Sequence, residues 1–345
     1  MKNVMSKLNI LYNTKTKKTY LAVALFTVIL LMLPNFVDSN YVLFLMLQVF
    51  INIIVSLGLN IIAGMTGQNH SATGAIYSIG AYVSAILTTK LGFSPWIGLI
   101  LSLLAGAFIG IVIGYPSLKL NSTFLWLVTS AFCEVVTLLE RNLVDLTGGT
   151  QGIKKIPFFS VFGKTLKKSS QIYYLYLIIM LVILAITIRI VDSRYGRTLR
   201  AIRDNEESMR SNGINDTSKK ILAFTISSIY CALAGTMYAH CYNYITPVSF
   251  QAISTNYLIM IMIGGFGTIP GSIIGAVLIT LLPEQLRFIQ NYNTLVFSTI
   301  TLLVALFMPK GIISLLDFKS DDNIFIKISN AQKEKKAVRK VENNG

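Results

Sequence analysis

NYVLFLMLQVFINIIVSLGLNIIAGMTGQ, residues Asn40 to Gln68, joins an apolar run of membrane-spanning length to a glycine-rich end. The apolar part, 41–63, is long enough to cross the roughly 30 Å hydrocarbon core of a bilayer as a helix. A helix satisfies its own backbone hydrogen bonds where no water is present. The stretch therefore predicts a transmembrane helix that is interrupted around Gly58, Gly64 and Gly67.

Similar apolar segments recur along the chain. They lie at 20–38, 41–63, 72–90, 95–115, 119–139, 172–191, 219–242, 252–264, 271–283 and 290–308. The 345 residues are 53% hydrophobic and 13% charged, with a mean hydropathy of +0.63, which is too apolar for a domain whose surface faces water. We therefore expect an all-α polytopic membrane protein with about ten transmembrane helices, some of them broken by glycine. Segment 20–38 is longer than the apolar region of a typical signal peptide and lacks a small-residue cleavage site, so it is expected to be retained as a first helix.

The basic residues indicate an orientation. The net charge is +15, but lysine and arginine lie between and beyond the apolar segments, which is typical of a membrane protein rather than of a nucleic-acid-binding one. Ten spans place both termini on one side, and the basic tails, 1–19 and 313–345, place that side in the cytoplasm at the cell membrane. The transmembrane domain is then 20–312, with loop 192–218 inside and loop 140–171 outside. The outer loop carries Arg141, Lys154, Lys155, Lys164, Lys167 and Lys168, and a re-entrant earlier segment would reverse its side.

A second glycine-rich segment, GGFGTIPGSIIGA, runs from Gly264 to Ala276. Small residues let helices pack closely, which is one explanation. The other is a pair of discontinuous helices that line a solute path, because interruptions in both halves of a membrane domain are typical of a transporter's binding region. We assign the substrate pathway to Gly64, Thr66, Gly67, Gln68, Ser71, Thr73, Gly264, Gly265 and Gly267. Ser71 is expected to cap the helix that resumes at Ala72 and so to aim free amides at a carboxylate.

A few polar side chains lie within the apolar segments. Glu134 is costly there and is a functional candidate by default, although a structural role, held by Thr137 or a neighbouring helix, is the favoured interpretation. His70 and His240 form no metal constellation and are expected to be polar caps. The three cysteines are expected to be small buried hydrophobes: Cys133, Cys231 and Cys241. No metal, cofactor or disulfide is predicted.

The loop SRYGRTLRAIRDNEESMRSNGIN, Ser193 to Asn215, is too polar for lipid but has the pattern of one amphipathic helix, which Gly213 ends. Leu199, Ile202 and Met209 share a face, and Arg200/Asp204 and Arg203/Glu207 have the i,i+4 spacing of ion pairs. Such a helix either lies on lipid headgroups or docks in a groove of a soluble partner.

This loop resembles the coupling segment of ABC importer permeases. Residues Glu206 to Gly213 match the EAA-type motif of that segment, which has a glycine at its end. More specifically, six motifs occur in the order seen in LivM-type permeases of the high-affinity branched-chain amino acid importers. They are GLNIIAGMTGQ, LTGGTQGI (146–153), YGRTLRAIRDNE with NGIN, LAGTMYAH (233–240), GGFGTIPGSIIGA and MPKGI (308–312). The resemblance covers about residues 40 to 315. It departs after Gln68, where His70 replaces a serine and Ala72 to Ala75 replace Gly-His-Ala-Ala.

The resemblance implies a permease subunit for leucine, isoleucine or valine that works by alternating access. It implies four partners: a homologous second permease subunit, two cytoplasmic ATP-binding subunits and an extracytoplasmic substrate-binding protein. The ATPase-coupling residues that it implies are Arg197, Arg200, Arg203, Glu206, Glu207 and Gly213. The chain is not expected to be an enzyme, since its nearest approach to a P-loop, Gly163-Lys164-Thr165, has Phe158 at the first glycine position.

Other functions stay open from the residues alone. A related permease for urea or short amides shares much of the pattern. An ion-coupled secondary transporter needs acidic groups on its path, for which Glu134 is the prominent candidate. An intramembrane enzyme needs a nucleophile and a base on facing helices, and no such cluster is visible.

Overall fold

The computed structural model describes residues 30–34, 39–117, 122–161, 164–166, 168–250, 253–285, 293–308 and 311–313. The basic N-terminus 1–19, most of the first expected span 20–38 and nearly all of the tail 313–345 lie outside these residues.

The described part of the chain is built almost entirely of helices. The long ones are α2 (Asn40–Leu59), α3 (Thr73–Thr89), α4 (Pro95–Ser117), α5 (Ser122–Asn142), α7 (Ser169–Asp192), α10 (Asp216–Tyr242), α11 (Ile253–Gly264), α12 (Ile269–Gln285) and α13 (Asn293–Phe307). Each lies on one of the expected apolar segments. Six segments are long and apolar enough to cross a bilayer, the last of which includes residues 251–252 that are not described: Asn40–Gly64, Pro95–Pro116, Thr123–Asn142, Ser169–Asp192, Asp216–Tyr242 and Pro247–Gly264. The protein is therefore an all-α multi-pass membrane protein.

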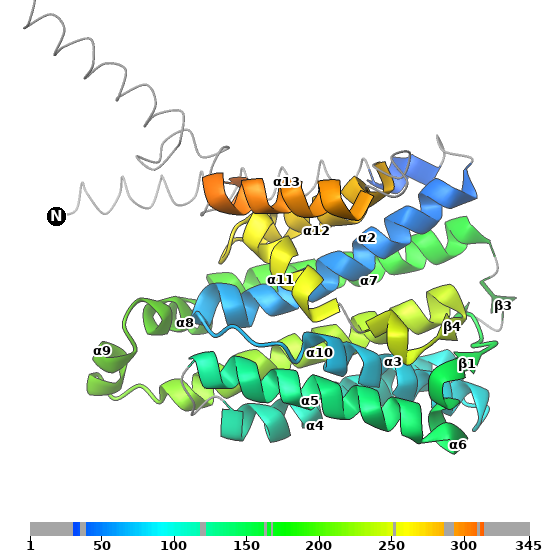
Figure 1. Cartoon of the computed structure of the whole chain (residues 1–345), viewed down its shortest axis with the longest axis horizontal. Coiled ribbons are helices and arrows are strands. Elements are labelled where there is room, and N and C mark those ends of the chain that lie inside the picture. Colours follow the sequence, from blue (N-terminus) through cyan, green and yellow to red (C-terminus); the bar gives the residue numbers. More distant parts are fainter. Residues whose placement is uncertain are drawn as a thin grey trace, which may run out of the picture.

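The two long polar loops lie at opposite ends of the molecule. Figure 1 shows the short helices α8 (Arg194–Asp204) and α9 (Glu206–Ser211) at one end. The other end carries α6 (Val144–Thr147) and the two-residue strands β1 (Ile153–Lys154), β3 (Lys164–Thr165) and β4 (Tyr244–Ile245). Strand β1 pairs antiparallel with β4, and β2 (Ser160–Val161) pairs with β3. The pairing of β1 with β4 ties the 140–171 loop to the end of α10.

Two buried helices hold the bundle together. Helix α10 packs against α2, α3 and α4, and α2 also packs against α7, α11 and α12. Every residue of α2 from 49 to 59 is buried. Helices α4 and α5, by contrast, leave large apolar side chains such as Phe108 and Leu127 exposed. Such side chains are compatible with lipid, so these helices form the periphery.

Helices α3 and α10 approach each other unusually closely. A Cβ on Gly80 would overlap the backbone of Ala232, and one on Gly235 would overlap the carbonyl of Tyr77. Small residues at such positions let helices approach until packing and hydrogen bonds hold them in a membrane. Next to this contact, the Oγ1 of Thr236 donates to the Oγ of Ser102 over 2.6 Å.

His240 joins three parts of the fold rather than capping a helix. Its Nε2 lies 2.8 Å from the Oγ of Ser84 on α3, and its Nδ1 lies 2.6 Å from the carbonyl oxygen of Pro157 in the 140–171 loop. The expected polar cap is therefore wrong for this residue, because α10 continues past it to Tyr242.

We expect Gly235→Val to destabilise the protein by about 1–3 kcal/mol, the usual cost of overfilling a packed contact. The added methyl groups must displace α3 from α10. The measurement is the midpoint of thermal unfolding in detergent, followed by gel filtration. Ala131→Val on the exposed face of α5 is the control and should leave the midpoint unchanged. Equal midpoints for Gly235→Val and wild type would contradict the close contact.

Candidate functional site

The two glycine-rich segments meet at the end of α2, where one side chain joins them. The last turn of that helical segment, Asn60–Gly64, is a π-helix. The Oδ1 of Asn60 accepts the amide of Gly267 over 2.7 Å, and its Nδ2 donates to the carbonyl of Thr268 over 3.0 Å. A carboxamide offers both a donor and an acceptor, so it can serve both backbone groups at once. Asn60 was not among the predicted site residues, although it lies inside the glycine-rich motif GLNIIAGMTGQ.

Arg203 of α8 lies against both glycine-rich segments. Its Nη1 donates to the carbonyl of Gly64. A Cβ on Gly267 would lie 3.1 Å from the same nitrogen, and a Cβ on Gly67 would lie 3.4 Å from the Cγ of Arg203. Gly67 and Gly267 have φ angles of +74° and +78°, a region that favours glycine. A predicted coupling residue is thus in contact with predicted pathway residues.

The remaining pathway residues near this junction are buried. The Oγ1 of Thr66 donates to the carbonyl of Ile62 over 2.6 Å. Gly264 and Gly265 are buried where α11 ends, and the amide of Ile312 donates to the carbonyl of Ile263 over 2.7 Å. The MPKGI motif thereby reaches the second glycine-rich segment.

The segment before α3 and the first residue of α3 contain buried polar atoms with no hydrogen-bond partner among the described residues. In this stretch they are the Oε1 of Gln68, both ring nitrogens of His70 and the Oγ1 of Thr73. The ring of His70 instead packs against Phe224, with centroids 4.7 Å apart. His70 is therefore not the expected polar cap.

The predicted single coupling helix is two helices, and the prediction was wrong at Asn205. The backbone of Asn205 is extended, with φ −158° and ψ 101°, and its Oδ1 accepts the amide of Ser208 over 2.9 Å. Asparagine competes with the helical backbone in this way and so begins a new helix. The expected pairs Arg200/Asp204 and Arg203/Glu207 are not among the ion pairs of the described residues. The second pair spans the break, so its members no longer share a helix face.

The arginines of α8 bind backbone carbonyls instead. Arg197 donates to the carbonyl of Asp192 over 2.9 Å, and Arg200 donates to that of Val191 over 3.0 Å. These carbonyls belong to the last turn of α7, where a cation is favoured by the helix dipole. The two side chains therefore fix α8 to α7.

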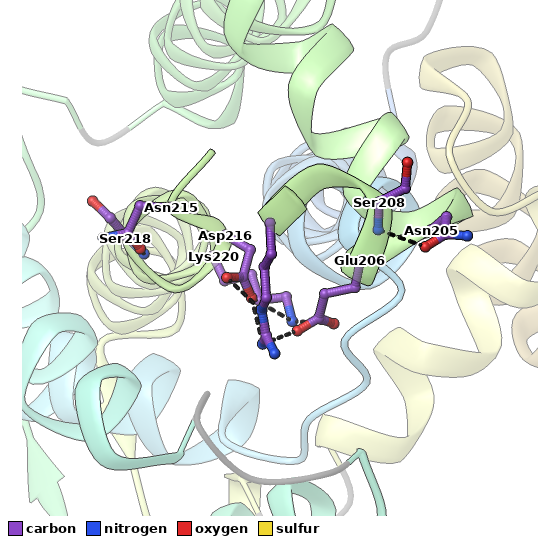
Figure 2. Close-up of polar contacts among 8 residues, drawn as sticks. Asn205, Glu206, Ser208, Asn215, Asp216, Ser218 and Lys220 are labelled. Atoms are coloured by element: carbon purple, nitrogen blue, oxygen red, sulfur yellow. Dashed lines mark hydrogen bonds and ion pairs between the residues drawn. The ribbon is translucent and has the colours of Figure 1, made fainter. Parts of the chain in front are cut away.

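A compact group of charges fixes α9 to the start of α10 (Figure 2). Glu206 lies 2.5 Å from Arg210 and 2.6 Å from Lys220. Asp216 accepts the Nε and Nη2 of Arg210, each over 2.9 Å. Lys220 is only 3% exposed, so its pairing keeps a buried charge compensated.

The last two predicted coupling residues face solvent. Glu207 is exposed on α9. Gly213 has a φ of +77° and donates its amide to the carbonyl of Arg210 over 2.9 Å. This left-handed residue ends α9, as the sequence predicted.

Helix α3 is short and begins beside α11. It has 17 residues, which correspond to about 25 Å, less than the roughly 30 Å of a hydrocarbon core. Ser254 of α11 joins the starts of the two helices, because its Oγ accepts the amide of Gly74 over 2.8 Å and donates to the carbonyl of Ser71 over 2.6 Å.

Ser71 does not cap α3, so that prediction was wrong. The helix begins at Thr73 without a side-chain cap, and the amide of Ser71 donates to the Oγ1 of Thr129 over 3.0 Å. Because Ser254 takes the amide of Gly74, the first turn of α3 offers that amide to no solute.

A pocket of about 240 Å³ opens beside these helix starts. The α3 side contributes Ser71, Gly74, Ala75 and Ser78, helix α5 contributes Trp126, Ser130, Cys133, Glu134 and Thr137, and the α11 side contributes Phe250, Ser254 and Thr255. Of the predicted pathway residues, Ser71 alone lines it. The spacing of the α5 residues places them on one helix face, and this polar stripe in an apolar span is a signal that the sequence analysis missed.

Glu134 lines this pocket, is exposed, and makes no hydrogen bond or ion pair with another described residue. The hydroxyl of Thr137 donates instead to the carbonyl of Cys133 over 2.9 Å. Thr137 therefore does not hold Glu134, contrary to that part of the prediction.

Residues 41–306 match the protein family described as branched-chain amino acid transport system, permease component. The chain belongs to this permease family. It is 32% identical to the high-affinity branched-chain amino acid transport system permease protein LivM of Salmonella typhimurium, over 76% of this chain and 68% of the relative. It is 27% identical to LivH of the same organism, over 75% and 90% of the two chains. It is 25% identical to BraD of Pseudomonas aeruginosa, over 75% and 90%.

No solved structure matches this permease significantly. The resemblance drawn from the ordered motifs is confirmed by the family match.

We expect Asn60→Ala to destabilise this permease, because it leaves the amide of Gly267 and the carbonyl of Thr268 without their partner. Each buried unpaired group costs about 1–3 kcal/mol. The measurement is the thermal unfolding midpoint in detergent. Asn142→Ala is the matched control, since Asn142 is at the exposed end of α5 and donates only to the carbonyl of Leu138 in its own helix. If both variants unfold at the wild-type temperature, Asn60 does not hold the junction.

Proposed function

We propose that this permease is the membrane subunit of an ABC importer that moves leucine, isoleucine and valine into the cell. The family match and the names of the relatives LivM, LivH and BraD support the substrate class. The partners are a homologous second permease subunit, two cytoplasmic ATP-binding subunits and an extracytoplasmic binding protein. ATP hydrolysis resides in the ATP-binding subunits, as the missing P-loop glycine at Phe158 supports.

The proposed topology has ten spans with both termini in the cytoplasm of the cell. Nine described helices lie on the expected apolar segments, and the segment 20–38 supplies the tenth. The positive-inside rule favours the cytoplasm for the arginine-rich end that carries α8 and α9. The 140–171 loop then faces outward, which its location at the opposite end supports (Figure 1).

The contact of Arg203 with Gly64 carries the proposed mechanism. A partner ATPase docks on α8 and α9 and engages the coupling residues Arg197, Arg200, Arg203, Glu206, Glu207 and Gly213. Arg197 and Arg200 hold α8 to α7, and Glu206 holds α9 to α10. A movement of α8 and α9 is therefore transmitted to both α7 and α10. Arg203 passes the movement directly to the glycine junction.

The solute path runs between the glycine-broken helices α2, α3, α11 and α12 and through the pocket that Ser71 and Ser254 share. Its residues are Gly64, Thr66, Gly67, Gln68, Ser71, Thr73, Gly264, Gly265 and Gly267. The unpartnered atoms of Gln68, His70 and Thr73 each raise the free energy of this arrangement by about 1–3 kcal/mol. This cost supports a second arrangement of similar free energy, in which the segment repacks, as alternating access requires.

We expect Arg203→Gln to lower ATP-dependent uptake of radiolabelled leucine at least about tenfold, since loss of one charge-assisted hydrogen bond costs about 1.5–3 kcal/mol. Uptake is measured in proteoliposomes that hold the complete set of subunits. Gly213→Pro should act in the same direction because proline cannot adopt the φ of +77°. Arg194→Gln, an exposed arginine of the same helix, is the matched control.

Uptake by the wild-type importer tests the proposed function itself. Leucine uptake that is indifferent to ATP would contradict the mechanism. ATP-driven uptake of another solute in place of leucine would retain the importer class and contradict the substrate.

We expect Gly67→Val to abolish leucine uptake while the subunits still assemble. Valine is strained at the φ of +74° and places a side chain against Arg203. Gly92→Val is the matched control, since Gly92 has a φ of +69° with open space around it. Co-purification of the subunits reports assembly. Wild-type uptake by Gly67→Val would exclude this residue from the pathway.

A further inference from the structure

The pocket beside the starts of α3 and α11 has one charged group in its wall. Of its twelve lining residues, Glu134 is the only ionisable acid or base other than the thiol of Cys133. The other polar groups around it are mainly hydroxyls, including those of Ser78 and Ser130. The pocket is therefore suited to a ligand with a positively charged group.

Glu134 differs from the paired acidic residues of α9 and α10. Glu206 and Asp216 both have cationic partners within 4 Å, whereas Glu134 has none among the described residues. A carboxylate within a transmembrane segment is costly, and such residues pair with a partner or bind a solute or ion. Because Glu134 lines a pocket, a solute can reach its carboxylate. The missing counter-charge of Glu134 therefore points to a cationic group on the solute.

We propose that Glu134 binds the protonated amino group of the transported solute. This inference rests on the proposed function and deepens it. An ammonium group has three donors. The carboxylate of Glu134 accepts from it, and the hydroxyl of Ser130, one turn earlier on the same face of α5, supplies a second acceptor. Trp126 and Phe250 offer apolar surface for an aliphatic side chain.

The proposal sets two classes of solute apart. Urea and simple amides are neutral and gain no ion pair at Glu134, whereas an α-amino acid carries the required ammonium. The volume of about 240 Å³ lies below the roughly 300–1,000 Å³ typical of sites for larger ligands. A small amino acid is the solute class that matches both the charge and the size.

The first test compares Glu134→Gln with wild type in proteoliposomes that contain the complete importer and leucine-loaded binding protein. Leucine uptake should fall about 10- to 100-fold, the effect of losing one hydrogen bond to a charged group. Glu134→Asp should recover part of the rate. Asp145→Asn, which removes an exposed charge outside the pocket, should transport like wild type. ATP hydrolysis without solute should be the same in all four.

The outcomes of this test separate the inference from the proposed function. Undiminished leucine uptake by Glu134→Gln overturns the role of Glu134 and leaves the importer intact. No ATP-driven leucine uptake by wild type overturns the proposed function itself. Wild-type uptake that follows an imposed sodium or proton gradient instead of ATP would make Glu134 an ion-coupling residue and overturn the inference.

A second test needs no variant to fold. A hydrophobic carbodiimide modifies carboxyl groups, and mass spectrometry follows its reaction with Glu134 in the wild-type complex. Millimolar leucine should slow the modification several-fold. 4-Methylpentanoate, which is leucine without its amino group, should not slow it. Equal protection by both compounds, or by neither, would overturn the proposal.

Discussion

Every backbone amide and carbonyl inside lipid needs a partner, and the structure depends on how this requirement is met where helices stop. At the end of α2, Asn60 supplies both partners for the turn that connects α11 to α12. At the starts of α3 and α11, Ser254 does the same for Gly74 and Ser71. These two side chains pair backbone groups at the end of α2, in the turn after α11 and at the start of α3. The junction and the pocket lie at these two places.

The polar helices α8 and α9 use the same kind of backbone group. Arg203 binds the carbonyl of Gly64, and Arg197 and Arg200 bind carbonyls at the end of α7. The contact of Arg203 joins this polar loop directly to the junction of the two glycine-rich segments, whereas Arg197 and Arg200 fix it to α7. Arg210 and Glu206 of α9 pair with Asp216 and Lys220 of α10, so these charges anchor α9 to α10.

The pocket lies beside the starts of α3 and α11. Helix α5 presents Trp126, Ser130, Glu134 and Thr137 to it from one face, opposite the starts of α3 and α11. An acidic group among hydroxyls and aromatic rings is suited to a small solute that is cationic at one point and apolar elsewhere. This suitability follows from the residues of the pocket alone. It agrees with the amino acid transport described for the family but does not depend on the family match.

The sequence by itself determined where the helices lie, which loops are polar and which family the chain belongs to. Those features follow from local composition measured against the thickness of a bilayer, and from motifs that are continuous in sequence. Only the tertiary structure decided the partners of the polar groups. Asn60 and Gly267 are 207 residues apart, and Gly74 and Ser254 are 180 apart, so neither pair has a local signal. The same holds for Ser71, whose expected cap gave way to tertiary hydrogen bonds. Asparagine is a common helix-capping residue, so Asn205 carried a local signal for the break. The amphipathic pattern around it nevertheless favoured one continuous helix.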